Sequence, residues 1–335
     1  MKKYLLPQDG NFYKANLHCH STVSDGELSP EEIKKVYMEK GYSIIAYTDH
    51  DVLIAHPELA DENFLPLNGY EVEINQIGDN PFRYRKTCHM CFIALDPDNL
   101  KQVCYHRSKY LFANALNYRD KVKYDENIPD FEREHTHECI NEMIKRAREA
   151  GFFVTYNHPN WSLENYTDYI GYNGMNAIEI CNNACLVGGF LDYNEKEYDD
   201  MLRAGKRIYC ISADDNHVYP KDFFGGYIMI KADKLEYKTV TDALLNGDFY
   251  ASQGPEIYDL YFEDGKIFVS CSDAKEIILH TGSRLHRPVM AQNGEVLNSA
   301  VLDVTPEDEY IRITVTDMYG NHANTNAFFV DELFK

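Results

Sequence analysis

The sequence contains no apolar run long enough to act as an export signal or to span a bilayer. We therefore expect a cytoplasmic protein with no membrane partner. Its nine cysteines are scattered through 335 residues, and an odd number without regular spacing indicates reduced thiols, not a disulfide framework. The one C-x-x-C, formed by Cys88 and Cys91, lacks a second pair and is more typical of strand packing than of a zinc site.

Positive charge is also scarce. The chain has 33 lysines and arginines against 54 acidic residues, a formal net charge of −21, which disfavours nucleic acid as a partner. The G-x-S-x-G, G-x-x-x-x-G-K and G-x-G-x-x-G patterns are absent, so serine hydrolysis and nucleotide-dependent transfer are disfavoured too. A small-molecule substrate is the better expectation, and the sequence specifies no oligomeric state.

Helix and strand patterns alternate in the first three quarters of the chain. Ser29-Pro30-Glu31-Glu32 is a capping box that predicts a helix over 30–40, before a strand at 43–47. A helical face with Ile140 and Met143 precedes a strand at 152–156, and one with Tyr198 and Met201 precedes a strand at 207–212. This order predicts a mainly parallel sheet, open or closed into a barrel.

Two segments depart from that order. Residues 96–133 are rich in Tyr, Lys, Arg and Asn with weak periodicity, and they suggest an insertion or a partly helical lid. From Gly254 onward, runs at 258–263 and 266–271 flank Asp264-Gly265, a two-residue hairpin turn. With further strands expected at 276–280, 310–316 and 327–330, we divide the chain into residues 1–253 and a small antiparallel, sandwich-like β domain at 254–335.

Histidines and carboxylates follow the apolar strands repeatedly. His18 and His20 come directly after Ala15-Asn16-Leu17, where an extended chain would point both imidazoles to one face. In a parallel barrel such strand ends converge on one side, and imidazoles mixed with carboxylates suit zinc, manganese or iron. The candidate ligands are His18, His20, Asp25, His50, Glu71, His89, His158, Asp215 and His217.

Two members of this set have an alternative interpretation. Asp25 precedes a glycine and is also typical of a turn, whereas His89 beside a strand is often a structural histidine. A second H-x-H pair, His135 and His137, precedes a helix, where residues two apart do not share a face, so we do not include it.

These motifs resemble the PHP family, the polymerase and histidinol phosphatase superfamily of metal-dependent phosphoesterases. The resemblance covers about residues 11–253 and is carried by six motifs in order: His18-Cys19-His20-Ser21 with Ser24-Asp25-Gly26, Thr48-Asp49-His50-Asp51, Gly69-Tyr70-Glu71, His89, Asn157-His158-Pro159 and Asp215-Asn216-His217. It implies a distorted (β/α)7 barrel with up to three metal ions at the carboxyl ends of the strands.

The resemblance also implies ligand sets. One ion would be held by His18, His20, Glu71 and Asp215, a second by Glu71, His89 and His158, and a third by Asp25, His50 and His217. Asp214 and Glu73 lie close to two of these positions, but the motif spacing favours Asp215 and Glu71.

The hypothesis that follows is hydrolysis of a small phosphate ester with two or three divalent ions (Zn, Mn or Fe), in which a hydroxide bridging two ions attacks phosphorus. Asp51 is a candidate for proton transfer; Arg83, Arg85 and Lys109 are candidates for binding phosphate, and Trp161 for walling the pocket. Hydrolysis of a carbamate, amide or carboxylic ester is the alternative reaction. A non-catalytic metal-binding or regulatory module is the alternative class, although structural zinc sites usually contain thiolates.

Overall fold

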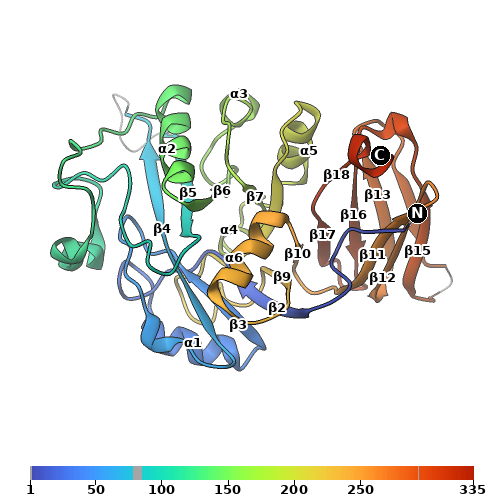
Figure 1. Ribbon diagram of the computed structural model, residues 1–335, viewed down its shortest axis with the longest axis horizontal. Coiled ribbons are helices and arrows are strands. Elements are labelled where there is room, and N and C mark those ends of the chain that lie inside the picture. The colour runs from blue at the N-terminus through green and yellow to red at the C-terminus, as the bar shows by residue number, and fades with distance from the viewer. Residues whose placement is uncertain (1, 78–84, 293) are drawn as a thin grey trace.

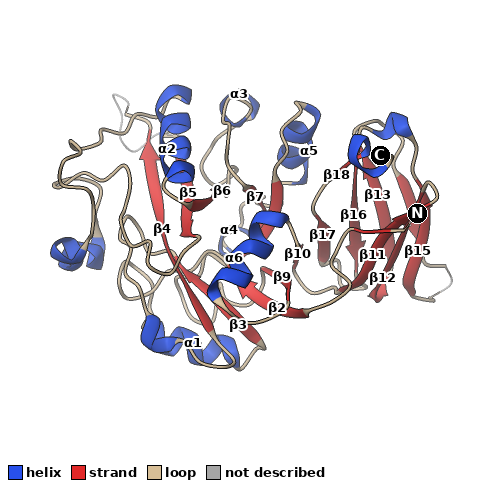
Figure 2. Cartoon of the chain, viewed as in Figure 1, coloured by secondary structure: helices blue, strands red, loops and turns tan. Residues whose placement is uncertain are grey.

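The computed structural model describes residues 2–77, 85–292 and 294–335, and it shows an α/β chain with a large β-rich part (Figures 1 and 2). The strands are β1 (Lys3–Tyr4), β2 (Asn11–Asn16), β3 (Tyr42–Tyr47), β4 (Leu65–Asn75), β5 (Thr87–Ala94), β6 (Phe152–Asn157), β7 (Ala177–Asn182), β8 (Tyr209–Ala213), β9 (Tyr227–Ala232), β10 (Phe249–Ser252), β11 (Ile257–Glu263), β12 (Lys266–Ala274), β13 (Glu276–Thr281), β14 (Arg287–Met290), β15 (Leu297–Asp303), β16 (Tyr310–Thr316), β17 (His322–Thr325) and β18 (Phe328–Phe329).

The helices lie mostly between the strands of the first three quarters of the chain. The α-helices are α1 (Pro30–Met38), α2 (His137–Glu149), α3 (Tyr166–Tyr169), α4 (Asn183–Val187), α5 (Glu195–Arg203), α6 (Tyr237–Asn246) and α7 (Val330–Leu333). The 3₁₀ helices are η1 (Pro57–Leu59), η2 (Ala113–Lys121) and η3 (Pro306–Asp308). None of the described helices has the length and apolarity needed to cross a bilayer.

The three predicted helix–strand units are present. Helix α1 begins with the capping box, in which Ser29 accepts from the Glu32 amide and Glu32 accepts from the Ser29 amide. Its buried face, which includes Ile33 and Tyr37, packs against β3. Helices α2 and α5 bury the apolar positions that predicted them and precede β6 and β8. The carboxyl ends of β3, β6 and β8 thus lie on the same side of the sheet.

The large sheet is mixed, not mainly parallel. Its order is β14-β13-β16-β17-β10-β9-β2-β3-β4-β5-β6-β7-β8, with β18 beside β16. Strands β2, β3 and β4 are parallel, as are β6, β7 and β8, but β5 runs antiparallel to both of its neighbours. Candidate functional residues of the parallel strands therefore lie within the strands or after their carboxyl ends, whereas His89 of β5 lies near the start of its strand.

The expected closed barrel is not what the described residues form, because no ladder joins β8 to β9. Strand β9 uses both of its edges, one for β10 and one for β2, and so has none to offer β8. The amide of Cys210 in β8 instead donates to Oδ1 of Asn326 at 3.0 Å. Closure is limited to one isolated parallel bridge beyond the strand ends, between Cys19 and Asn216.

The C-terminal part consists of two β layers. A separate sheet of order β1-β11-β12-β15 and strands β13 and β16 of the large sheet share one buried cluster, with Leu260 and Val269 on one side and Ile277 and Ile313 on the other. Strand β17 connects this part to the strands of the first part within the large sheet, because it pairs with β10. The N-terminal strand β1 pairs with β11 in the separate sheet. The division at residues 253 and 254 stays a prediction.

The segment 96–133 covers the site end of the sheet without forming an α-helix; its one regular element is η2. Apolar side chains attach it to the loops after β2 and β3, since Leu111, Ala115 and Val122 share a buried cluster with Val23 and Val52. The segment is therefore packed onto the loops that carry the first two motifs.

Candidate metal centre

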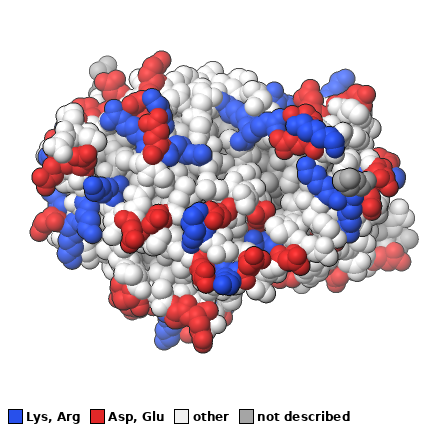
Figure 3. Space-filling model, in the orientation of Figure 1, with Lys and Arg blue, Asp and Glu red and all other residues white. Residues whose placement is uncertain are grey.

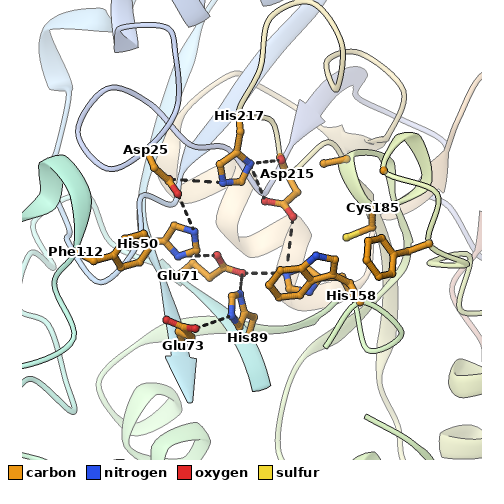
Figure 4. A pocket seen from close by; sticks show the side chains of 14 residues that line it. Asp25, His50, Glu71, Glu73, His89, Phe112, His158, Cys185, Asp215 and His217 are labelled. Carbon is orange, nitrogen blue, oxygen red and sulfur yellow. Dashed lines mark hydrogen bonds and ion pairs between the residues drawn. The ribbon is translucent and has the colours of Figure 1, made fainter. Parts of the chain in front are cut away.

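The nine predicted ligands converge on one region near the strand ends, and Figure 4 labels Asp25, His50, Glu71, His89, His158, Asp215 and His217 among them. His18 and His20 follow β2, His50 follows β3, His158 follows β6, and Asp215 with His217 follows β8. Glu71 lies within β4, and His89 lies near the start of the antiparallel β5. The strand directions therefore account for the placement of His89, which breaks the rule that the other histidines follow.

Glu71 lies at the centre of this cluster and is 1% exposed. Its Oε1 is 3.1 Å from Nε2 of His18 and 3.1 Å from Nδ1 of His89, while its Oε2 is 3.2 Å from Nδ1 of His50. Nε2 of His158 lies 3.3 Å from Oε1. With Nε2 of His20 at 3.4 Å from Oε2, this carboxylate faces five imidazoles, an arrangement that would allow it to bridge two ions.

Asp215 occupies a second position of this kind. Its Oδ1 lies 3.0 Å from Nε2 of His20 and 3.2 Å from Nε2 of His18. The neighbouring Asp214 points elsewhere, accepting from the Tyr37 hydroxyl and from the backbone amides of residues 224–226. Asp215, which the motif spacing favoured, is therefore the carboxylate that faces the histidines.

Asp25 lies at the solvent side of the cluster, with its side chain 29% exposed. Its carboxylate is 3.7 Å from Nδ1 of His20, 3.8 Å from Nε2 of His50 and 3.6 Å from Nε2 of His217. The loop that presents it returns closely past the first motif, because a Cβ on Gly26 would lie 2.4 Å from the His20 carbonyl oxygen. Asp49 holds the same loop by accepting from the Ser21 amide and the Ser24 hydroxyl.

Two observations indicate that this cluster could bind divalent metal ions: the spacing of its ligand atoms and the buried atoms that lack a hydrogen-bond partner. Four groups of three or four residues offer ligand atoms within 4.8 Å of one another: His18, His20, Glu71 and Asp215; His20, Asp25, His50 and His217; His50, Glu71 and His89; His18, His158 and Glu179. Among the described residues, five buried atoms of this cluster have no hydrogen-bond partner: His20 Nδ1, His50 Nδ1, Glu71 Oε2, His89 Nε2 and Asp215 Oδ1. Buried polar atoms without partners are costly, so a bound cation would satisfy them.

The electrostatics favour carboxylates in their ionised form. Burial raises the pKa of Glu71, but the charges of His18, His89 and His50 outweigh it and the net pKa is well below its usual range. Burial lowers the pKa of His20 to about 3, and His217 and His50 add to that effect. His20 is thus a neutral imidazole, the form that binds a metal ion.

The sequence interpretation missed Glu179, which is fully buried in β7. Its Oε1 lies 2.7 Å from Nδ1 of His18, and its Oε2 accepts from the His158 amide at 3.0 Å. No short motif marks it, but an acidic side chain inside the apolar run Ala177-Ile178-Glu179-Ile180 is a signal, since unpaired carboxylates are almost never fully buried.

The other predicted residues are placed differently. Both oxygens of Asp51 accept from the Arg133 guanidinium, so this carboxylate is engaged away from the pocket, and proton transfer by it stays an untested prediction that the geometry does not favour. Arg85 donates to the Gln76 carbonyl, and Lys109 pairs with Glu132 on the surface. Arg83 lies outside the described residues.

A pocket of about 330 Å³ opens over the cluster, which is within the size range of small-molecule sites. It is lined by Asp25, His50, Glu71, Glu73, His89, Phe112, His158, Trp161, Ala184, Cys185, Gly188, Phe190, Asp215 and His217. Trp161 is one of the lining residues, and its contact with a substrate stays a prediction. No lysine or arginine appears among these described lining residues, which leaves the phosphate-binding role of Arg85 and Lys109 without support.

Comparison with known protein families gives a match in the first half of the chain. Residues 16–139 match the PHP domain family, which confirms the resemblance carried by the motifs in that range. A 69-residue stretch is 38% identical to a 5'-3' exoribonuclease of Haemophilus influenzae. The matched stretch is 19% of this chain and 25% of that protein, so the chain spans only a quarter of the length of this relative.

Solved structures are more distant. A two-domain protein of Bacteroides vulgatus containing a predicted PHP-like metal-dependent phosphoesterase is 15% identical, with 98% of this chain and 90% of that chain covered and a TM-score of 0.45. An amidohydrolase of Chromobacterium violaceum with bound sulfate is 16% identical, with 62% and 89% covered and a TM-score of 0.41. These likenesses are too low to support an inference about function.

Proposed function

Because the chain carries a PHP domain over residues 16–139, we propose that it is a metal-dependent hydrolase and that its substrate is a small phosphate ester. The observation that supports the proposal most strongly is that five of the eleven unpartnered buried side-chain atoms among the described residues lie in one cluster of histidines and carboxylates. These atoms come from five different segments of the chain, and no cysteine contributes, which is unlike a closed structural zinc site.

The proposed ligands divide into groups that share members. His18, His20, Glu71 and Asp215 would hold one ion, and Glu71, His89 and His158 a second, with Glu71 common to both. Asp25, His50 and His217 would hold a third at the solvent side, close to His20. Shared carboxylates keep neighbouring ions near each other, which suits two-metal hydrolysis.

Bound divalent ions would act as Lewis acids on the oxygens of the ester and make water a stronger acid. The residues of this chain would position and orient the metal ligands. Glu179 fixes the ring of His18, and Asn157 donates to Oε1 of Glu71 at 3.1 Å, so both ligands are held from behind. The pocket above them is lined by Phe112 and Trp161.

Hydrolysis of a carbamate, amide or carboxylic ester is the second candidate, and one observation favours it. The described lining residues include no arginine or lysine, the side chains that usually recognise phosphate oxygens outside the metal ions. A polynucleotide substrate is less favoured: on the face drawn in Figure 3, Lys and Arg are interspersed with Asp and Glu and form no continuous basic strip.

The experiment is a hydrolysis panel on the metal-containing protein, with phosphomonoesters, phosphodiesters, carbamates and carboxylic esters of one common leaving group. We expect turnover of at least one phosphate ester, loss of that turnover on chelation, and loss in His20→Ala. The control is His137→Ala, which removes the second histidine of the other H-x-H pair. Turnover of carbonyl esters alone would favour the second candidate, and a metal-loaded protein without any turnover would favour a binding or regulatory module.

A further inference from the structure

One wall of the pocket is apolar and partly uncovered. Apart from the histidines and carboxylates, the pocket is lined by Phe112, Trp161, Ala184, Cys185, Gly188 and Phe190. Trp161 is 39% exposed and Phe190 is 40% exposed. Next to them, Val187 is 44% exposed and Leu191 is 78% exposed. An exposed apolar group beside a polar cavity marks a contact surface for a ligand.

The Trp161 ring is fixed against the ligand histidines. Its centroid lies 5.2 Å from that of His89 and 5.1 Å from that of His158, with the rings edge to face. The Trp161 amide donates to Oδ2 of Asp192 at 2.8 Å, and the preceding Asn160 amide donates to Oδ1 at 3.0 Å. The ring is therefore held in place before any ligand arrives.

The Phe190 side of the wall is joined to the metal centre through Asn182. This residue caps α4 by accepting from the Cys185 amide, and its Nδ2 donates to Oε2 of Glu179 at 2.9 Å and to Oδ2 of Asp215 at 3.1 Å. The Phe190 amide donates to the Cys185 carbonyl at 2.9 Å. The small residues Ala184, Cys185 and Gly188 leave a shallow surface between the ring and the metal ligands.

The opposite side of the cluster also has an aromatic ring. Phe112 contacts His50 at a centroid distance of 4.8 Å, and Figure 4 shows Phe112 and Cys185 on opposite sides of the ligands. Phe190 lies in the segment after α4 and is hydrogen-bonded to Cys185, whereas Trp161 lies in the segment after β6 and contacts His89 and His158. A substrate whose reacting group faces Glu71 and Asp215 would place its remaining atoms against this apolar wall, where the described lining offers no cation.

We propose that the pocket selects esters with a flat apolar leaving group, such as an aryl group, which packs against Trp161 and Phe190. The inference rests on the proposed hydrolase function and names its substrate class. Burial of an aromatic face excludes water from both rings and supplies affinity that the absent cations cannot. Alkyl esters of similar reactivity would lack that contact and bind more weakly.

The single tryptophan of the chain makes the test direct, because Trp161 is the only source of indole fluorescence. Phenylphosphonate and methylphosphonate, which are not hydrolysed, are titrated into the metal-containing protein, with fluorescence and calorimetry as parallel readouts. We expect phenylphosphonate to bind about tenfold more tightly and to change the Trp161 emission. In Phe190→Ala we expect the preference to fall below about threefold, whereas Phe334→Ala, at an exposed ring in the C-terminal part, keeps it.

Equal affinities for the two phosphonates, absence of binding by both, or an unchanged preference in Phe190→Ala would overturn the inference. Hydrolysis of the ester panel is scored separately. Turnover without an aryl preference would remove only this inference, and an aryl preference without turnover of any ester would remove the hydrolase proposal while leaving the apolar site in place.

Discussion

The Nδ1 atom of His18 lies 2.7 Å from Oε1 of Glu179, and both side chains are fully buried. This contact orients the imidazole so that its other nitrogen, Nε2, faces Glu71 and Asp215 at 3.1 and 3.2 Å. A carboxylate that receives the far N–H of a histidine fixes the tautomer and raises the basicity of the nitrogen that binds the metal. Glu179 is thus a positioning residue for the proposed centre.

The first prediction concerns that contact. Glu179→Gln should weaken metal binding by about tenfold to one hundredfold, the usual effect of removing the carboxylate behind a histidine ligand. The measurement is competition with a chelator of known affinity, with circular dichroism to show that the fold is retained. Glu263→Gln, in β11 of the C-terminal part, is the matched control. Unchanged affinity in Glu179→Gln would contradict the assigned role.

Removal of metal should lower the melting temperature. Ions that bind only the folded chain stabilise it, by about 2.7 kcal/mol when the free metal is one hundred times its dissociation constant. Thermal unfolding with and without chelator measures the difference. His322→Ala, outside the cluster, should retain the metal-dependent shift. Identical melting temperatures in the two conditions would show that the cluster does not bind metal under those conditions.

The buried ion pair between Asp51 and Arg133 leads to a stability prediction. Arg133 donates to both oxygens of Asp51 and to the Glu73 carbonyl, and its guanidinium lies over the Tyr110 ring at 4.2 Å. Arg133→Met should cost about 3–5 kcal/mol in unfolding free energy, because it leaves the Asp51 carboxylate buried without its partner. Urea unfolding provides the value.

The double variant Asp51→Asn, Arg133→Met separates the pair from the rest of the segment. Since neither charge remains, we expect it to recover most of the lost stability. A cost below about 1 kcal/mol for Arg133→Met alone would mean that the pair does not hold the 96–133 segment to the loop after β3.

A second buried arginine predicts a pH dependence. Arg312 in β16 is fully buried, and its guanidinium binds both oxygens of Asp199 in α5 at 2.9 Å, with Glu195, His280, Arg203 and Tyr310 close by. Burial raises the pKa of Asp199, but the hydrogen bonds and the charge of Arg312 outweigh it, so the net pKa lies below the ordinary value of 3.8.

A carboxylate with a depressed pKa stabilises the fold above its unfolded pKa, and that contribution is lost as the pH falls through the folded pKa. The difference in unfolding free energy between wild type and Asp199→Asn should therefore be largest near neutral pH and shrink below about pH 4. Urea unfolding at several pH values measures it. A difference that grows on acidification would contradict the assignment.

Local rules account for the elements that the sequence predicted well. The Ser29 capping box and the buried face of α1 depend on neighbours within one helical turn, and the strand at 43–47 follows from a short apolar run. The convergence of His50 and His217 on Asp25 required that β3 and β8 be parallel and that the sheet curve until the chain after β2 meets the chain after β8, as in the Cys19–Asn216 bridge.

Other features depend on contacts between distant residues. The sheet stays open because β9 pairs with both β10 and β2, and no local pattern specified its direction. Arg133 and Asp51 are 82 positions apart, so sequence periodicity could not reveal that this carboxylate is already paired. At the far end, the strand expected over 327–330 is only Phe328–Phe329, because α7 begins at Val330.

The most direct test of the metal centre is the metal content of the purified protein, measured by elemental analysis for wild type and His20→Ala. His20 belongs to two of the four ligand groups, so its loss should affect more than one ion. We predict two or more divalent ions per wild-type chain and a clear loss in His20→Ala, with His137→Ala unchanged. Less than one ion per wild-type chain after growth with added zinc, manganese and iron, or full metal content in His20→Ala, would contradict the account.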